Sequence, residues 1–138
     1  MRSLLVVVFI CVLGCRPAVS ESDLPLLNGY WEIEKVVFSD GNTKQYQSST
    51  TIDYIELEGR KGFRKKVYPK LDGSFEVTND AEFFTLKVSE KGFVFDYDTG
   101  LSEWQEELTQ LSSDHFSVVN EDGVTYKYKR FDPINITR

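Results

Sequence analysis

The chain is poor in the residues that most often carry catalysis or hold metals. Its 138 residues include one histidine, His115, and two cysteines, Cys11 and Cys15. A hydrolase triad needs a positioned base, usually histidine, and metal sites need clustered Cys, His or acidic ligands. Acidic pairs are expected by chance among 22 Asp and Glu residues. We therefore predict no catalytic residues, no metal site and no cofactor, and a protein that is not an enzyme.

Positive charge is also scarce. Lys and Arg number 16 against 22 Asp and Glu, which gives a formal net charge of -6. Because a phosphate backbone attracts a basic surface, this balance excludes a general nucleic-acid binder. Hydrophobic residues make up 41% of the chain and aromatic residues 14%, which is enough for one core in a chain of single-domain length.

Long hydrophobic runs are absent after residue 14. Before it, Arg2 precedes residues 4–13, an apolar run that is typical of a signal peptide. The run is shorter than the ~20 residues of a membrane-spanning helix. It ends in Val12-Leu13-Gly14-Cys15, which resembles a bacterial lipobox. We expect residues 1–14 to be a lipoprotein signal peptide and Cys15 to carry acyl chains, palmitate among them. The alternative is an ordinary secreted protein that is cleaved near residues 18–20.

The residues that follow Cys15 indicate a place in the cell envelope. Arg16 stands where an aspartate would favour retention in the inner membrane under the enterobacterial rule. We therefore expect a protein that is lipid-anchored, more favourably in the outer than in the inner membrane. Residues 15–28 comprise the lipidated cysteine and a polar segment with two prolines, which predicts a tether to the folded domain. Periplasmic and surface display both stay open.

From Gly29 onward, apolar and polar residues alternate in short segments that turn residues separate. In the first segment we expect Trp31, Ile33 and Val37 to share one face. The other expected strands are 51–58, 63–68, 74–78, 82–89, 93–98, 103–111, 115–120 and 124–131, of which 103–111 could instead form a helical turn. Short turns favour pairing between neighbours in the sequence. We predict an all-β fold, an up-and-down antiparallel barrel of about eight or nine strands over residues 29–131, with a short tail at 132–138.

Three segments carry a family resemblance. Leu26-Leu27-Asn28-Gly29-Tyr30-Trp31 resembles the Leu-x-Gly-x-Trp opening of lipocalin-like domains in small lipoproteins of Bacteroidetes. Residues 108–116 and 123–131 resemble the last two strands of that family, and residues 62–67 are similar to a flavobacterial subgroup. The resemblance implies a lipocalin-like barrel in which Gly29 turns the chain into the first strand, Trp31 closes one end and Arg130 stacks across Trp31.

Large aromatic residues are candidates for the barrel interior. They either fill it as a core or line a pocket at its mouth, where the resemblance implies a small apolar ligand. The residues that would line such a pocket are Trp31, Tyr54, Phe84, Phe95, Trp104 and Tyr126.

Five cations lie within residues 60–66 of this acidic chain, namely Arg60, Lys61, Arg64, Lys65 and Lys66. Alternation places Arg64 and Lys66 on one strand face and Lys65 on the other. The cluster either contacts an acidic partner or protects an edge strand from pairing. Two hypotheses for function follow. The first is a lipid-anchored envelope protein that binds a small apolar ligand. The second is a non-enzymatic accessory lipoprotein subunit that docks on an outer-membrane protein complex.

Overall fold

The computed structural model describes residues 19–47 and 51–132, which form an antiparallel β-sheet and one short 3₁₀ helix. The expected signal peptide, Cys15 and most of the C-terminal tail lie outside the described residues. The elements are η1 (Glu21–Leu27), β1 (Gly29–Val37), β2 (Thr43–Gln45), β3 (Ile52–Glu58), β4 (Lys61–Pro69), β5 (Phe75–Ser89), β6 (Gly92–Asp98), β7 (Glu103–Leu111), β8 (His115–Asn120) and β9 (Thr125–Arg130).

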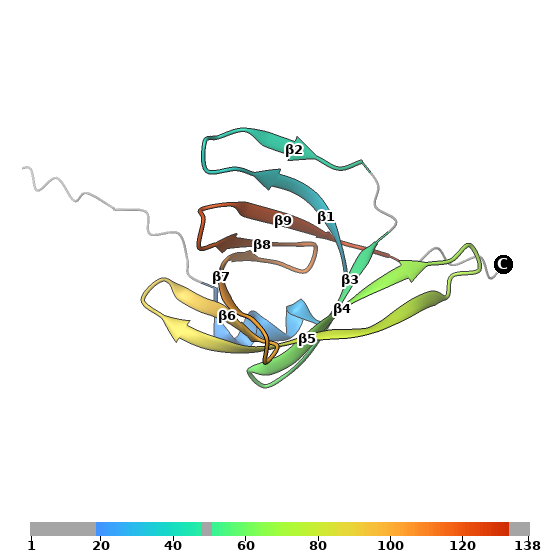
Figure 1. Cartoon of the computed structure of the whole chain (residues 1–138), viewed down its shortest axis with the longest axis horizontal. Helices are drawn as coiled ribbons and strands as arrows, with labels where there is room; N and C mark the ends of the chain where they lie inside the picture. Colours follow the sequence, from blue (N-terminus) through green and yellow to red (C-terminus); the bar gives the residue numbers. More distant parts are fainter. Residues whose placement is uncertain (1–18, 48–50, 133–138) are drawn as a thin grey trace, which may run out of the picture.

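The sheet closes on itself as an up-and-down barrel. From β3 to β9 each strand pairs with the next along the chain, β1 pairs with β3, and β1 also pairs with β9. The eight strands β1 and β3–β9 therefore form the closed barrel, and β2 adds a short ninth strand at the end of β1 (Figure 1). This arrangement confirms the predicted all-β barrel, and residues 103–111 form a strand as expected.

A bulge in β1 decides which of its residues face the interior. The pairing of β1 with β9 runs from Trp31 opposite Arg130 to Val37 opposite Thr125, with a register shift between Ile33 and Lys35. Because one extra residue reverses the alternation of faces, Val36 is buried and Val37 is only half-buried. The expectation that Val37 shares the face of Trp31 was wrong for this reason.

The two strands expected at 74–78 and 82–89 are one continuous strand, β5. Its first part pairs with β4 and its last part with β6, and a register shift between Lys65 and Val67 lets the long strand bend. In Figure 1 the β4–β5 hairpin, drawn in green, extends to the right beyond the rest of the barrel. Asn79 and Asp80 suggest a turn by composition, yet both are exposed residues within β5.

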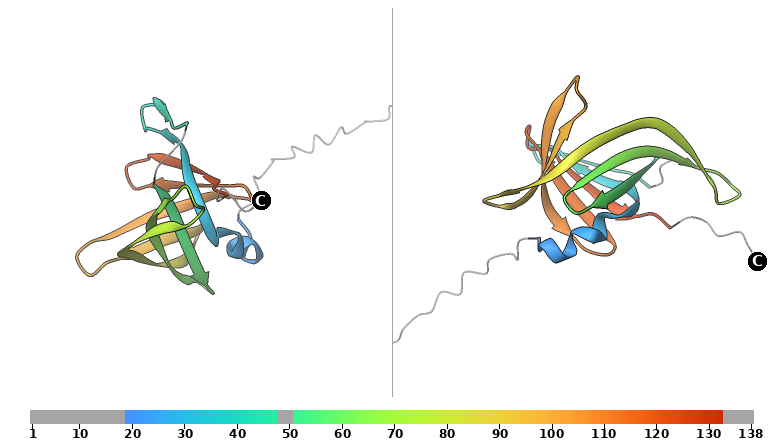
Figure 2. Two further views of the ribbon diagram at one scale, coloured as in Figure 1. Left: turned by 90° about the vertical axis from the view of Figure 1, so that its right-hand side faces the viewer. Right: turned by 90° about the horizontal axis from the view of Figure 1, so that it is seen from below.

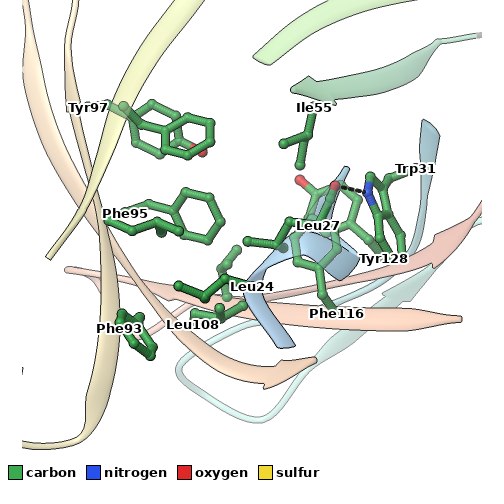
Figure 3. Packing of buried hydrophobic residues seen from close by; sticks show 13 residues of the cluster. Leu24, Leu27, Trp31, Ile55, Phe93, Phe95, Tyr97, Leu108, Phe116 and Tyr128 are labelled. Carbon is green, nitrogen blue, oxygen red and sulfur yellow. Dashed lines mark hydrogen bonds between the residues drawn. The ribbon is translucent and has the colours of Figure 1, made fainter. Parts of the chain in front are cut away.

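The segment expected to be a tether contains an element of the fold. η1 places Leu24 and Leu27 in the core, at 2% and 0% exposed. The two leucines are three residues apart, which is one turn of a 3₁₀ helix, so they share a face. The Trp31 indole nitrogen donates a hydrogen bond of 2.8 Å to the Leu27 carbonyl, drawn as a dashed line in Figure 3. Figure 2 shows η1, in blue, packed against one end of the barrel.

The core occupies the part of the barrel next to η1. Trp31 meets Phe116 edge to face at 4.7 Å between ring centroids, and Phe116 stacks on Tyr128 at 4.6 Å. Phe93, Phe95 and Leu108 pack around the η1 leucines from the opposite wall (Figure 3). In the described part of the chain, no helix is long and apolar enough to cross a membrane.

Candidate functional site

One end of the barrel is closed by Arg130, near the end of β9. Its guanidinium lies 4.1 Å from the centroid of the Trp31 ring. The same group donates hydrogen bonds to three backbone carbonyls, those of Leu26 (2.6 Å), Asn28 (2.9 Å) and Ser113 (2.5 Å). Arg130 thereby joins the end of η1 to the β7–β8 turn across the indole, which seals this end.

Gly29 makes the approach of Arg130 possible. Its backbone has a φ of 123°, which side chains rarely tolerate. A Cβ at this position would lie 2.6 Å from the Arg130 Nη1 atom. Gly29, Trp31 and Arg130, the three residues that the resemblance assigns to closure, therefore lie together.

A layer of buried charge crosses the middle of the barrel. Arg64 of β4 and Asp53 of β3 are 6% and 4% exposed, and their side chains form an ion pair with 2.6 Å between Nη2 and Oδ2. Lys66 bonds the other Asp53 oxygen from a more exposed position. The Arg64 guanidinium also lies 4.8 Å from the Tyr128 ring centroid and donates to the Tyr97 hydroxyl at 3.3 Å. Two cations therefore share one buried carboxylate.

The buried groups keep their ordinary charges in this layer. Burial alone would raise the pKa of Asp53, but the charges and hydrogen bonds of Arg64 and Lys66 outweigh it and lower that pKa. Burial would likewise lower the pKa of Arg64, but Asp53 raises it. Burial raises the pKa of Tyr128 to about 12 and that of Tyr97 further, so both phenols stay protonated.

A pocket of about 280 Å³ lies next to this charged layer, and Arg64 forms part of its lining. Its walls come from the middle of β4 and of β5, the start of β7, the end of β8 and the start of β9, whereas η1 contacts the end of β3. The pocket is therefore at the barrel end away from η1, and we call it the open-end pocket. Its lining residues are Arg64, Lys66, Glu82, Trp104, Glu106, Asn120, Tyr126 and Tyr128.

Glu106 is the one acidic side chain among the described residues whose pKa is clearly raised. It is half-buried on β7, and burial raises the pKa of its carboxyl even though the charge of Arg64 opposes the shift. It forms no ion pair within 4.0 Å among the described residues. Its carboxyl therefore faces the cations across the pocket without touching them.

The six aromatic residues expected in a ligand site are distributed over three environments. Trp104 and Tyr126 line the open-end pocket. Trp31, Phe84 and Phe95 belong to the buried core. Tyr54 lies on the outer wall, where its ring is 4.9 Å from that of Tyr30.

The five cations of residues 60–66 are divided in a similar way. Arg64 is buried inside the barrel and Lys66 bonds Asp53 at the pocket. Arg60 pairs with Glu21 of η1 at 2.7 Å. Lys61 is exposed and pairs in register with Thr85, and Lys65 lies 5.1 Å over the outer ring of Phe63. The basic cluster is thus not one surface.

A second pocket, with a larger volume of about 770 Å³, lies on the outer wall beside Phe63 and Phe83. All of its lining residues are exposed or half-buried. The open-end pocket, by contrast, combines the buried charge of Arg64 with aromatic side chains, so it offers both a polar contact and apolar surface to a ligand. Within residues 19–47 and 51–132, no group of three or more His, Cys, Asp or Glu side chains could hold a metal ion.

Sequence reasoning missed Glu82, Glu106, Asn120 and Tyr128 as pocket residues, and it missed Asp53 as the buried ion-pair partner of Arg64. Alternation did place Arg64 and Lys66 on one face, and the strand pattern TIDYIELE puts Asp53 on the face of Ile55. An aspartate at an inward position of an apolar strand was the available signal, because a buried carboxylate requires a cationic partner.

The chain matches a known protein family. The profile of the lipocalin-like domain matches residues 27–118, which is more than half of the chain. The chain therefore belongs to the lipocalin-like domain family, and this confirms the resemblance seen in the sequence.

Several solved structures are similar to this chain at low sequence identity. A lipocalin-like protein from Bacteroides uniformis is 11% identical, with a TM-score of 0.49 over 77% of this chain and 99% of that one. An uncharacterized protein from Bacteroides eggerthii is 11% identical, with a TM-score of 0.47 over 76% and 99%. Lobster apocrustacyanin A1 is 13% identical, with a TM-score of 0.45 over 80% and 63%. No match was found among curated proteins.

Proposed function

We propose that this chain is a non-enzymatic binding protein that holds one small, largely apolar ligand in the open-end pocket. The observation that carries the proposal is the asymmetry of the barrel, with one end sealed by η1, Trp31 and Arg130 and a pocket of about 280 Å³ at the other. Eight-stranded barrels of this kind either fill with side chains or hold one small ligand, as lipocalins do. In this barrel, side chains fill the half next to η1, and the other half contains the pocket for the ligand.

The pocket volume and its walls support a ligand of modest size. Ligand pockets usually measure ~300–1,000 Å³, so this one suits a compact molecule of which part stays at the opening. Trp104 and Tyr126 offer flat apolar surface. The division of the basic cluster also favours ligand binding over docking, because Arg64 and Lys66 are turned toward the pocket.

The place of action that we propose is the cell envelope, with the protein attached through acyl chains on Cys15, more favourably to the outer membrane. The lipobox-like end of the apolar run at residues 4–13 supports this assignment. Growth with a palmitate analogue should label the wild-type protein and leave Cys15→Ser unlabelled and released from the membrane. Equal membrane retention of both forms would contradict the anchor.

Binding can be tested with N-phenyl-1-naphthylamine, an uncharged fluorophore that accepts energy from tryptophan. Trp31 is buried in the core and Trp104 lines the pocket, so Trp104 is the donor near the expected site. We expect saturable 1:1 binding with transfer from tryptophan that falls strongly in Trp104→Phe.

A blocking variant with a matched control locates the probe. Glu82 lines the pocket rim, whereas Glu76 lies earlier on the same strand, exposed and outside the pocket. Glu82→Trp should fill the opening and weaken probe binding at least tenfold, and Glu76→Trp should leave the affinity within twofold. Equal binding by both variants would place the probe elsewhere and refute the pocket as the ligand site.

A further inference from the structure

We infer that the ligand of the open-end pocket is an amphipathic monoanion, with its acidic group between Lys66, Arg64 and Glu106 and its apolar body against Trp104 and Tyr126. This inference rests on the proposed function and adds the chemical class of the ligand. It adds one acidic group to the small apolar ligand expected from the sequence, because Arg64 and Lys66 line the pocket.

The balance of charge on the pocket floor favours an anion. Among the described residues, Asp53 is the one carboxylate that pairs with Arg64 and Lys66, so these two cations exceed the negative charge of the floor when Glu106 is protonated. The Arg64 side chain is 7% exposed, so its charge acts in a medium that screens little. Lys66 is 53% exposed at the side chain, which leaves ammonium protons for a ligand at the opening. A single negative charge from the ligand would complete the pairing.

Binding of the negatively charged ligand depends on the protonation state of Glu106. Its carboxyl lies across the pocket from Arg64, and its ionised form would repel an anion. Burial raises its pKa, so the protonated form, which can donate a hydrogen bond to a ligand oxygen, persists to higher pH than in an ordinary glutamate. Binding of a monoanion should therefore be accompanied by protonation of Glu106.

Charged and titratable groups face Glu106 from every strand around the pocket. They are Asp53 on β3, Arg64 and Lys66 on β4, Glu82 on β5, Tyr97 on β6 and Tyr128 on β9. The pKa values of Tyr97, Tyr128 and Arg64 are raised, so these groups keep their charge state in the pH range of the experiment, and the pKa of Asp53 is lowered. Glu82 is exposed to solvent, which screens its charge. Among these groups, Glu106 is the one expected to change charge on binding.

The test compares two probes that share one aromatic skeleton. 8-Anilinonaphthalene-1-sulfonate is a monoanion over the whole working pH range, and N-phenyl-1-naphthylamine is its analogue without the sulfonate. We expect the anion to bind the full chain at least tenfold more tightly at pH 6. Its affinity should rise as pH falls from 8 to 5, and the affinity of the uncharged probe should stay level.

Four variants assign the effect to residues. Lys66→Gln should weaken binding of the anion about five- to tenfold, the loss of one charge-assisted hydrogen bond, and change the uncharged probe less than twofold. Lys65→Gln removes the same charge from the next residue, on the outer wall, and should change neither probe. Glu106→Gln should abolish the pH slope and bind the anion at pH 8 as wild type does at pH 5. Glu82→Gln should keep the slope.

The outcomes separate this inference from the proposed function. If both probes bind in the pocket and the uncharged one binds equally or more tightly, the acidic ligand is wrong and the binding function stands. Equal effects of Lys66→Gln and Lys65→Gln would mean that the preference for the anionic probe reflects the net charge of the protein and not a contact in the pocket. That result would also overturn the inference. If neither probe binds saturably, the proposed function fails together with it.

Discussion

Loss of the Arg130 side chain should weaken the sealed end of the barrel more than any comparable surface change. In Arg130→Met the apolar stem is kept, but three hydrogen bonds to backbone carbonyls and the contact with the Trp31 ring disappear. Hydrogen bonds from a charged donor contribute ~1.5–3 kcal/mol each when buried, and a cation over an indole ~0.5–2 kcal/mol. Because Arg130 is only partly buried and water can solvate the freed carbonyls, we expect a loss of about 3 kcal/mol in the free energy of unfolding.

Urea denaturation followed by circular dichroism measures this loss. With a slope of ~1–2 kcal/mol per molar urea, the midpoint should fall by about 2 M. Lys129→Met is the matched control, because it removes the same charge from the neighbouring residue of β9. We expect that control to lie within ~0.5 kcal/mol of wild type, as most surface substitutions do. If Arg130→Met and Lys129→Met lose the same stability, Arg130 does not hold the sealed end in the way its contacts indicate.

Three further predictions concern stability. Asp53→Asn should cost ~3–5 kcal/mol of unfolding free energy, because it leaves the Arg64 charge buried without its carboxylate. In wild type the stability that the ionised Asp53 contributes should be fully present above the ordinary aspartate pKa and should disappear as the pH falls through its lowered pKa in the folded state. An acid titration of Asp53→Asn should not show this loss of stability. Gly29→Ala should cost ~2–3 kcal/mol in thermal unfolding, from backbone strain and displacement of Arg130, and less when Arg130→Met is also present. Leu24→Ala should cost ~2–5 kcal/mol by urea titration, and a loss below ~1 kcal/mol would mean that η1 is not part of the core.

The barrel could be predicted because its signals are local. Alternating apolar residues and short turns define most strands, and the ends of the chain carry Gly29, Trp31 and Arg130, which close the ring. The errors arose where the local signal is ambiguous. Asn79 and Asp80 look like a turn, but in a long strand at the rim they are solvated on the exposed side of a bend. η1 looks like a tether because Pro25 and acidic residues surround its two buried leucines.

The charged layer could not be predicted from the sequence, because its members come from separate strands. Asp53 and Arg64 are eleven positions apart and meet only through the pairing of β3 with β4. Glu106 joins them from β7, whose place opposite β4 depends on closure of the whole barrel. The basic segment at residues 60–66 of this acidic chain suggested a surface patch that contacts a partner. The pairing register instead turned Arg64 to the inside, where burial and Asp53 give it a different role.

The sealed end has a kinetic consequence for any ligand. A barrel with a single opening allows no passage through it, so a molecule must leave by the path through which it arrived. Shortening a rim side chain that the ligand does not need, as in Glu82→Ala, should therefore change association and dissociation rates together and leave the equilibrium constant less affected. Val19 packs against the core and lies four residues after Cys15. The lipid proposed at Cys15 would hold the protein by its sealed side, with the opening turned away from the bilayer.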